Sequence, residues 1–378
     1  MHPGFHPSPS LLKPDWRAIG PALLLAVALF SFATPARALI IIPVWDSSIT
    51  NDPNAATIQG TINMAIQFYE ARFADPITVS ITFQKESIGL GTSFSFFAAI
   101  PYTQFLANLQ RDATTTNDAI ALAHLPPGPN NPVTGDANIK VKTANLKALG
   151  ITGYEPPNGI DGAISLNTSI MNLTRANINP DYYDLLGVAE HEIDEVLGLG
   201  SDLAATNDPF PQDLFRYSST GARTFTTDGD DAWFSLDGTN LLVRFNQQPD
   251  HDYGDWWSND GQPHTPRVQD AFFAPGATPH PTVELIALDV QGYDLIPPPQ
   301  PGIVNITLSG ANLVLHGANG LATATYCLLA TTNLALPVNQ WSSVATNVLT
   351  ANGNFSFTAT NAVIPNSPRQ FYILQLLQ

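Results

Sequence analysis

The chain contains one cysteine, Cys327, among its 378 residues. An intrachain disulfide is therefore excluded, as is a zinc site built from several thiolates. Methionine is nearly as rare, at positions 1, 64 and 171 only. Basic residues are also few, with 15 Lys and Arg against 32 Asp and Glu, which gives a net charge of −17. Such an acidic surface repels nucleic acid and anionic lipid, so neither is an expected partner.

Long apolar runs are absent beyond the N-terminal region, where Ala22–Phe30 is one. Lys13 and Arg17 precede this run, and Ala36-Arg37-Ala38 offers a small-residue cleavage site. The run is shorter than the roughly 20 residues of a spanning helix. These features predict a secretory signal peptide over residues 1–38, cleaved after Ala38, and a secreted or extracytoplasmic protein without stable membrane insertion. Its removal takes away three basic residues and one acidic residue, leaving 12 against 31 and a net charge of −19.

The remaining sequence is rich enough in apolar residues to fill a core, with 44% apolar and 10% aromatic side chains. The run Ile296-Pro297-Pro298-Pro299-Gln300-Pro301-Gly302 is typical of an extended, semi-rigid spacer. The sequence therefore predicts one domain over residues 39–296, a Pro-rich linker over 297–302 and a second domain over 303–378.

Both helical and strand patterns occur in the first domain. Alternating apolar residues predict strands at Leu39–Val44, Ile77–Phe83 and Gly162–Asn167. Apolar residues at helical spacing predict a helix over Asn54–Phe73. The region from Ser87 to Gly159 is rich in Pro, Gly, Asn and Thr, and no element is assigned there.

The second domain shows only strand patterns. Six β-rich segments, separated by turn pairs such as Asn319-Gly320, predict a small all-β sandwich. They are Val304–Leu308, Asn312–His316, Ala322–Ala330, Trp341–Leu349, Phe355–Thr360 and Gln370–Leu376. These strands carry no cluster of titratable residues, so we expect no chemistry in this domain.

A second helix of the first domain carries the candidate chemistry. Asn179-Pro180 is a typical helix start, acidic Asp181 and Asp184 suit its first turns, and Gly198 and Gly200 allow a sharp turn at its end. On this helix His191 and Glu195 are four residues apart, so their side chains project from one face and can share a metal ion.

Glu192 directly follows the first of these ligands. In the zinc-peptidase pattern His-Glu-x-x-His, this glutamate takes a proton from the water bound to zinc. Here Glu195 replaces the second histidine. A carboxylate is a legitimate zinc ligand, but its negative charge makes the bound water less acidic, so metal binding tolerates the change better than turnover does.

Four acidic side chains crowd this part of the helix, and like charges at such spacing destabilise it. A bound divalent cation offsets the repulsion. The other interpretation is an acidic surface helix with one histidine, and in either case we expect Glu190 and Asp194 to face solvent.

The stretch His191–Ser201 resembles the extended zinc motif of the metzincin peptidases, His-Glu-x-x-His-x-x-Gly-x-x-His/Asp. Together with Asp213–Tyr217 and Ala287–Asp294 it looks like secreted bacterial metalloproteases of matrixin or serralysin type, over roughly residues 40–296. The resemblance implies an α+β fold: a metzincin-like catalytic domain with a mixed sheet and an active-site helix, in which the edge strand Gly162–Asn167 would pair with a peptide substrate.

Two positions depart from the metzincin pattern. Ser201 stands where the third metal ligand would be, and the methionine of the turn beneath the zinc is absent. Asp202 and Asp213 are the candidates for the third Zn²⁺ ligand, because a carboxylate after the glycine turn or on the next segment could reach the metal. Further possibilities are His251, His264 and His280.

Two other acidic stretches are Asp228-Gly229-Asp230-Asp231 and His251–Trp257. Oxygen-rich loops suit Ca²⁺, which is a second cation to consider, but the twelve-residue calcium-loop spacing is missing, which favours solvated turns. The pair Trp256-Trp257 is more typical of a core than of a carbohydrate platform.

The sequence thus supports three hypotheses. The first is a secreted zinc-dependent endopeptidase acting on protein or peptide substrates, with Glu192 as general base. The second is a peptidase-like metal-binding protein that has lost turnover and acts as an extracellular binding module. The third is a structural secreted protein with a solvated acidic helix.

Overall fold

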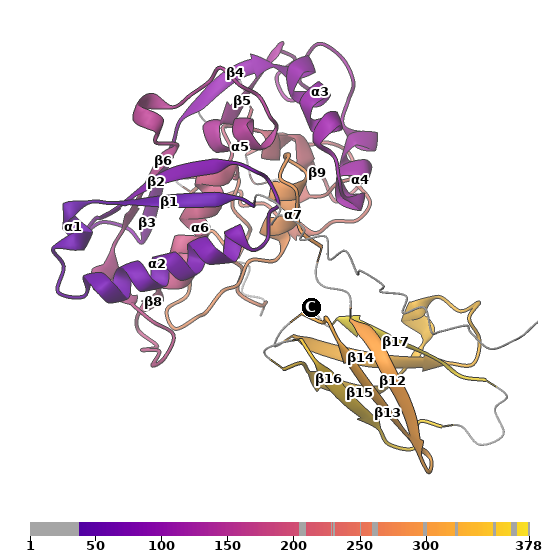
Figure 1. Cartoon of the computed structure of the whole chain (residues 1–378). Helices are drawn as coiled ribbons and strands as arrows, with labels where there is room; N and C mark the ends of the chain where they lie inside the picture. Colours follow the sequence, from indigo (N-terminus) through magenta and orange to yellow (C-terminus); the bar gives the residue numbers. More distant parts are fainter. Residues whose placement is uncertain are drawn as a thin grey trace, which may run out of the picture. The chain divides into compact units, whose positions relative to one another are not determined.

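The computed structural model describes residues 38–203, 209–227, 229, 231–249, 251–258, 264–297, 301–321, 324–350, 353–363 and 369–376 (Figure 1). The predicted signal peptide lies outside them, apart from its last residue. Helices and strands are mixed along the chain, which confirms an α+β composition. Within the described residues no helix combines the length and hydropathy needed to cross a bilayer.

A four-stranded sheet organises the first part of the chain, in the order β1-β2-β6-β3. Its strands are β1 (Ile40–Trp45), β2 (Thr78–Lys85), β6 (Gly162–Leu166) and β3 (Gly91–Ser95). The first three are parallel, and β3 runs antiparallel to β6. The prediction that Gly162–Asn167 is the edge strand is therefore wrong: β6 is an inner strand, and β3, from the segment left unassigned by the sequence, forms the edge.

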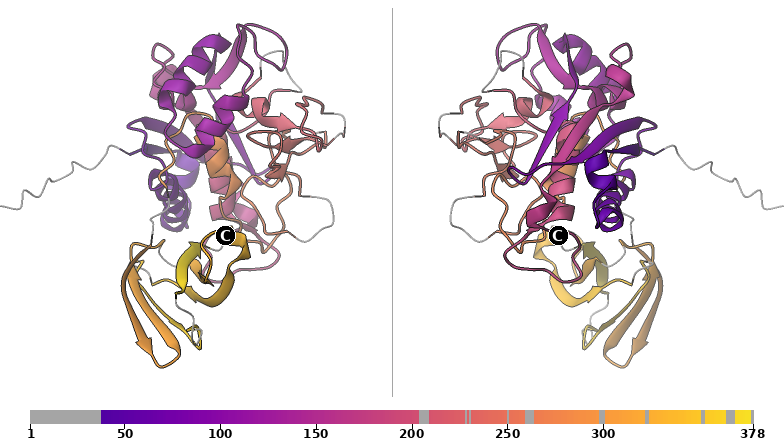
Figure 2. Two further views of the ribbon diagram at one scale, coloured as in Figure 1. Left: turned by 90° about the vertical axis from the view of Figure 1, so that its right-hand side faces the viewer. Right: turned by 90° about the vertical axis from the view of Figure 1, so that its left-hand side faces the viewer.

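Seven helices are described: α1 (Ser47–Thr50), α2 (Ala55–Glu70), α3 (Tyr102–Asp112), α4 (Thr116–His124), α5 (Thr143–Ala148), α6 (Leu185–Leu197) and α7 (Val283–Asp289). Helices α2 and α6 contact each other, and α6 packs against β3 and β6. Figure 2 shows α2 nearly end-on beside the sheet. The predicted helix over Asn54–Phe73 is confirmed as α2.

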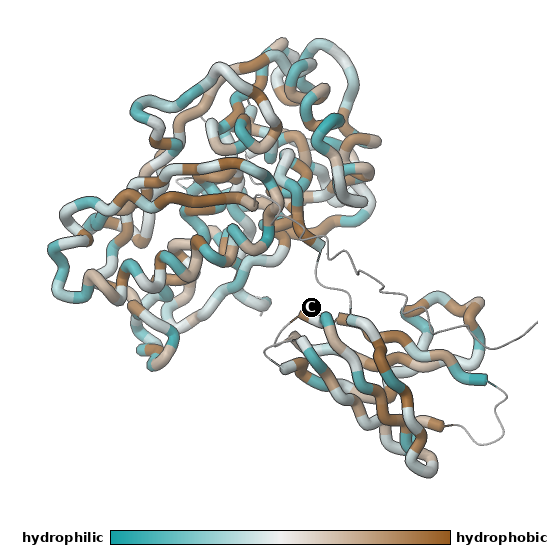
Figure 3. Tube along the Cα trace, in the orientation of Figure 1, coloured by the Kyte–Doolittle hydropathy of each residue, from teal (hydrophilic) through white to brown (hydrophobic). Residues whose placement is uncertain are grey.

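The alternation in β2 explains the packing of this layer. Val79, Ile81 and Phe83 are fully buried, whereas Ser80 and Thr82 between them are more exposed. Hydrophobic residues concentrate along these strands (Figure 3). They join the apolar stripes of α2 and α6 in one core, which extends from Leu39 to Tyr293.

The segment that the sequence left unassigned contains a hairpin-like pair beside the helices. Strands β4 (Phe97–Pro101) and β5 (Asn138–Lys142) pair antiparallel, with α3 and α4 between them in the chain. Shorter pairings follow, formed by β7 (Met171–Asn172), β8 (Tyr183–Asp184), β9 (Arg216–Tyr217), β10 (Trp233–Phe234) and β11 (Val243–Arg244).

The C-terminal part has its own small core. One sheet has the order β12-β13-β16 and the other the order β15-β14-β17. All six predicted strands are confirmed: β12 (Gly302–Ser309), β13 (Asn312–Ala318), β14 (Thr325–Thr331), β15 (Ser342–Val348), β16 (Phe355–Ala359) and β17 (Phe371–Leu376).

A buried carboxyl group outside the predicted site makes stability depend on pH. Asp75 is 1% exposed, and its Oδ2 accepts a hydrogen bond from the Asp294 amide at 2.9 Å. Burial, with the charges of Asp294 and Asp289, raises the pKa of Asp75 to about 7. Because the folded pKa lies above the unfolded value, this carboxyl stabilises the fold at low pH, and that contribution is lost as pH rises from about 4 to 7.

The substitution Asp75→Asn keeps an acceptor for the Asp294 amide but removes the titration. Between pH 4 and pH 7 we expect the free energy of unfolding of the wild type to fall with pH, and to fall more steeply than that of the variant. The difference between the two slopes should be about 1 kcal/mol per pH unit. Urea titrations across this range measure the difference. Equal pH profiles for the two proteins would contradict the expectation.

Candidate functional site

Helix α6 begins five residues later than the sequence predicts. Asp184 is its N-cap, and Oδ2 of this residue accepts a hydrogen bond from the Gly187 amide at 2.9 Å. The same carboxylate pairs with Arg175 at 2.6 Å. Asn179-Pro180 instead precedes a turn and β8, because Asn179 accepts the Tyr182 amide. The predicted end is confirmed: Gly198 caps the helix, and Gly200 has a φ of +121°, which glycine adopts readily.

The acidic side chains of α6 are not solvated. Glu190 is 3% exposed and Asp194 is fully buried, so the prediction that they face solvent is wrong. Burial raises the pKa of Glu190 to about 8 and that of Asp194 well above its usual range. Both shifts favour the neutral form of the carboxyl, which removes part of the repulsion along the helix. The interpretation of α6 as an acidic surface helix is excluded with it.

The ring of His191 is oriented by a later segment of the chain. Its Nδ1 donates a hydrogen bond to the Val268 carbonyl at 2.8 Å, which leaves Nε2 without a proton in the neutral ring. Gln269 Nε2 donates to the His191 carbonyl at 2.8 Å, and the Phe273 ring meets the imidazole edge-on, with 5.9 Å between centroids. The free nitrogen faces Glu195 Oε1 at 3.6 Å and Asp255 Oδ1 at 3.8 Å.

His191, Glu195 and Asp255 form the one group in the described part of the chain whose ligand atoms all lie within 4.8 Å of one another. Two carboxylates and an imidazole are a suitable set for Zn²⁺. Asp255 Oδ1 is buried and accepts no hydrogen bond from any described residue. A cation at this point would satisfy that oxygen and the free imidazole nitrogen, so the residues present fit a metal ion.

The electrostatics of the cluster favour positive charge. Burial works to raise the pKa of Glu195, but the hydrogen bond and charge of His191, with the charge of Lys142, lower it to about 2. Burial works to lower the pKa of His191, but Asp255 and Glu195 raise it well above its usual range. The point where the three groups meet therefore attracts either a proton on the imidazole or a metal cation.

Asp255 reaches the helix because its loop packs directly on the turn after α6. A Cβ on Gly254 would lie 2.5 Å from Gly200 Cα, so only glycine allows this approach. Gln212 bridges the two segments, accepting from the Gly200 amide at 2.5 Å and donating to the Gly254 carbonyl at 2.7 Å. Asp252 adds a second link, since its Oδ1 accepts from the Ser201 amide at 3.1 Å and from the Gly254 amide at 2.6 Å.

Lys142 supplies a buried positive charge beneath the cluster. Its Nζ donates to the carbonyls of Glu195 at 2.6 Å and Leu199 at 2.5 Å, which satisfies groups that the helix end leaves unpaired. Burial lowers the pKa of Lys142 against the opposing effect of Glu195 and Asp252. Its hydrogen bonds are with the backbone, so Lys142 closes α6 and leaves the metal ligands free.

The side chain of Glu192 lies between the backbone of α6 and the edge strand β3. It is 4% exposed, and its Oε2 accepts no hydrogen bond within the described structure. A Cβ on Gly91 of β3 would overlap Glu192 Oε1 and lie 2.8 Å from Val188 Cγ1. Gly91 is therefore required to accommodate this carboxyl. Burial, followed by the charge of Glu195, raises the pKa of Glu192 well above its usual range.

Asp202 and Asp213 are not brought to the cluster. Asp202 forms an ion pair with Lys140. Asp213 is buried and accepts hydrogen bonds from Ser201 Oγ at 2.6 Å, the Phe210 amide at 3.1 Å and the Asp202 amide at 3.3 Å. Both carboxylates thus hold the chain after α6, and the third place beside His191 and Glu195 belongs to Asp255.

The later histidines lie elsewhere. His264 Nε2 is 3.0 Å from Asp270, His280 contacts Arg175, and the ring of His251 packs against Phe272. In the acidic stretch considered for Ca²⁺, Asp228 and Asp230 lie outside the described residues, and Asp231 pairs with Arg244 at 2.7 Å. Trp256 is fully buried, as predicted for a core residue.

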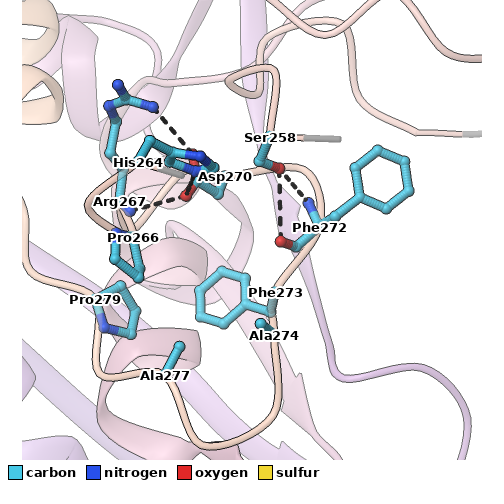
Figure 4. Close-up of a pocket in the computed structure, with 10 residues that line it drawn as sticks. All are labelled: Ser258, His264, Pro266, Arg267, Asp270, Phe272, Phe273, Ala274, Ala277 and Pro279. Atoms are coloured by element: carbon cyan, nitrogen blue, oxygen red, sulfur yellow. Dashed lines mark hydrogen bonds and ion pairs between the residues drawn. The ribbon is translucent and has the colours of Figure 1, made fainter. Parts of the chain in front are cut away.

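A cavity of about 220 Å³ lies among residues 258–279 (Figure 4). Phe273, which contacts His191, forms part of its wall, with Pro266 and Pro279 opposite. Asp270 is at the polar end of the cavity, where the Arg267 amide donates to its Oδ2 at 2.9 Å. The cavity is large enough for one side chain.

Comparisons of the sequence with models of known protein families, with curated proteins and with solved structures find no match. The site is thus defined by its own geometry. Sequence reasoning missed Asp255 and Gly91 as parts of it. Asp255 belongs to the stretch His251–Trp257, whose carboxylates signalled a cation, but nothing in its spacing connects it with His191.

The geometry predicts which carboxylate contributes to metal affinity. We expect Asp255→Asn to weaken Zn²⁺ binding more than about 100-fold, because loss of an outer partner alone costs 10–100-fold. Asp202→Asn, the matched control, removes an ion pair outside the cluster and should bind zinc as the wild type does. Competition titration with a chromophoric chelator measures both affinities. If the two substitutions weakened zinc binding equally, Asp202 would again be a candidate metal ligand.

Proposed function

We propose that this chain is a secreted zinc-dependent endopeptidase whose first domain is metzincin-like and whose metal is held by His191, Glu195 and Asp255. The observation that carries the proposal is that these three side chains meet at one point. His191 and Glu195 come from a helix and Asp255 from a loop 60 residues further on, and His191 Nε2 faces both carboxylates while Nδ1 is held by a backbone carbonyl. The buried Asp255 Oδ1 accepts no hydrogen bond within the described residues. Glu192, the residue after the first ligand, is the general base.

Zinc bound at such a site lowers the pKa of a water molecule and polarises the scissile carbonyl. The chain supplies the proton transfer. Glu192 Oε2 has no hydrogen-bond donor in the described residues, and a cation held by the cluster would favour the charged form of this carboxyl against its burial. As a carboxylate it would accept the proton of the attacking water and then deliver it to the leaving amide nitrogen. The contact with Gly91 fixes the position of this carboxyl between the helix and the edge strand.

The edge strand β3 supports a polypeptide substrate. It lies at the end of the sheet, and Ser93 on this strand donates a hydrogen bond to Glu195 Oε2 at 2.6 Å. A peptide that adds to β3 as a further strand would therefore run beside the metal ligands. The cavity bordered by Phe273 would receive one of its side chains.

A second function is favoured by Glu195 in place of a histidine. Two carboxylate ligands reduce the acidity of a metal-bound water, so a peptidase-like protein that binds metal without turnover, and acts as an extracellular binding module, is the alternative. Secretion rests on the N-terminal pattern of residues 1–38. The paired sheets of the C-terminal part support the proposal of a β-sandwich there.

The substitution Glu192→Gln separates these functions. We expect it to leave zinc content unchanged and to reduce cleavage of an unfolded protein substrate by about 100- to 10,000-fold, the usual contribution of a general base. Zinc analysis and a fluorogenic cleavage assay on the same samples provide the comparison. Zinc binding without cleavage by the wild type would favour the binding module, and equal cleavage by both proteins would remove Glu192 from the mechanism.

Gly91→Ala tests the placement of Glu192 without changing its chemistry. The added methyl group overlaps Glu192 Oε1, so we expect a loss of kcat of at least about tenfold with zinc retained. Thr92→Ala, at the next and exposed position of the same strand, is the control and should retain activity. Wild-type kcat in Gly91→Ala would show that the carboxyl can move without consequence.

A further inference from the structure

The two parts of the chain differ sharply in charge. Residues 301–378 contain no Asp, Glu or Lys, and Arg369 is their one charged side chain apart from histidine. The acidic residues therefore all lie before the linker. Two copies of the chain repel each other through their acidic parts, and the neutral C-terminal part is where they can approach without that repulsion.

Strand β12 leaves hydrophobic side chains uncovered in this neutral part. It is an edge strand, and all eight of its residues are exposed. Ile306 pairs with Leu315 and Leu308 pairs with Leu313, so these isoleucine and leucine side chains share the sheet face of two core residues. Even so, Ile306 is 51% and Leu308 65% exposed, whereas Leu313 and Leu315 are buried in the cluster with Tyr326 and Leu328 of β14.

Edge strands of monomeric proteins are normally protected against pairing by charges, proline or bulges. In β12 a bulge interrupts the register between Ile303 and Asn305. From Asn305 to Ser309 the pairing with β13 is regular, and this stretch has neither a charge nor a proline. These five residues present an unprotected edge of unpaired backbone groups.

The same stretch is complementary to itself. In an antiparallel pair with a two-fold axis at Thr307, Ile306 of one copy lies opposite Leu308 of the other, and both belong to the hydrophobic face. Thr307 lies opposite Thr307, and Asn305 lies opposite Ser309, so polar residues meet polar residues on the other face. Cross-strand pairs of both kinds stabilise antiparallel sheets.

We propose that β12 is a self-association surface, through which a second copy of the chain pairs antiparallel about Thr307 and joins two three-stranded sheets into one of six strands. The interface is isologous and closes as a dimer. It is small, near the lower limit of about 1,000 Å² for specific interfaces, so the dimer is reversible and forms in the micromolar range.

Sedimentation of the full-length chain over about 1 to 100 µM tests the association, the range being set by the expected affinity. We expect a monomer–dimer equilibrium in the wild type and at least a tenfold weaker one in Ile306→Lys, which puts a charge on the hydrophobic face of the edge. Thr346→Lys adds the same charge at an exposed position of the other sheet's edge strand β15 and should associate as the wild type does. Two results would overturn the proposal. One is a wild type that stays monomeric over the whole concentration range, whether its β12 edge is free or bound by another protein. The other is an Ile306→Lys variant that associates as strongly as the wild type.

Disulfide trapping tests the register. Cys327 is 5% exposed, so an introduced cysteine provides the reactive thiol. Thr307→Cys should form a covalent dimer rapidly on mild oxidation, whereas Asn305→Cys alone should not, because each Cys faces Ser309 of the other copy. A mixture of Asn305→Cys and Ser309→Cys should cross-link as heterodimers. Equal cross-linking of Thr307→Cys and Asn305→Cys alone contradicts the register. These substitutions lie outside the proposed metal site, so their outcome is independent of proteolytic activity.

Discussion

The close contact between Gly254 and Gly200 is the constraint on which the site depends. Helix α6 alone provides His191 and Glu195, and two ligands on one helical face hold a metal weakly. Asp255 reaches them only because the backbones of Gly254 and Gly200 touch, with Gln212 and Asp252 fixing the approach through four hydrogen bonds. Arg216 strengthens the arrangement from below, donating to the Tyr253 carbonyl at 2.6 Å. A side chain at Gly254 would meet the Gly200 backbone and move Asp255 away from the helix, whereas at Gly200 it is the positive φ that favours glycine.

The distribution of charge around α6 follows from burial. Carboxyls on the far side of the cluster, such as Glu190, have raised pKa values and lose their charge, which limits repulsion in the core. Glu195, between His191 and Lys142, keeps its charge because its pKa is about 2. Burial raises the pKa of Asp255, so the lasting negative charge of the cluster is that of Glu195, beside the His191 ring. This explains how a helix with four acidic residues in six positions can bury three of them, Glu190, Glu192 and Asp194.

How much could be predicted from the sequence depended on the range of the interactions. Local periodicity identified α2, β2 and the C-terminal strands, and the spacing of His191 and Glu195 identified one face of α6. The start of α6 was misjudged because Asn179-Pro180 and Asp184 both look like caps, and only the tertiary contact of Asp184 with Arg175 distinguishes them. Asp255 and β3 depend on contacts between segments about 60 to 100 residues apart. No local pattern encodes those.

The replacement of histidine by Glu195 is consistent with the surroundings of that position. The neighbour of this position is Ser93, whose hydroxyl donates to Glu195 Oε2 at 2.6 Å. A carboxylate uses one oxygen for Ser93 and presents the other, Oε1, to the side of His191. Glu195 therefore connects the edge strand to the cluster by a single side chain. Under the proposed function, a polypeptide paired with β3 would lie one hydrogen bond, from Ser93 to Glu195, from a residue of the candidate metal site.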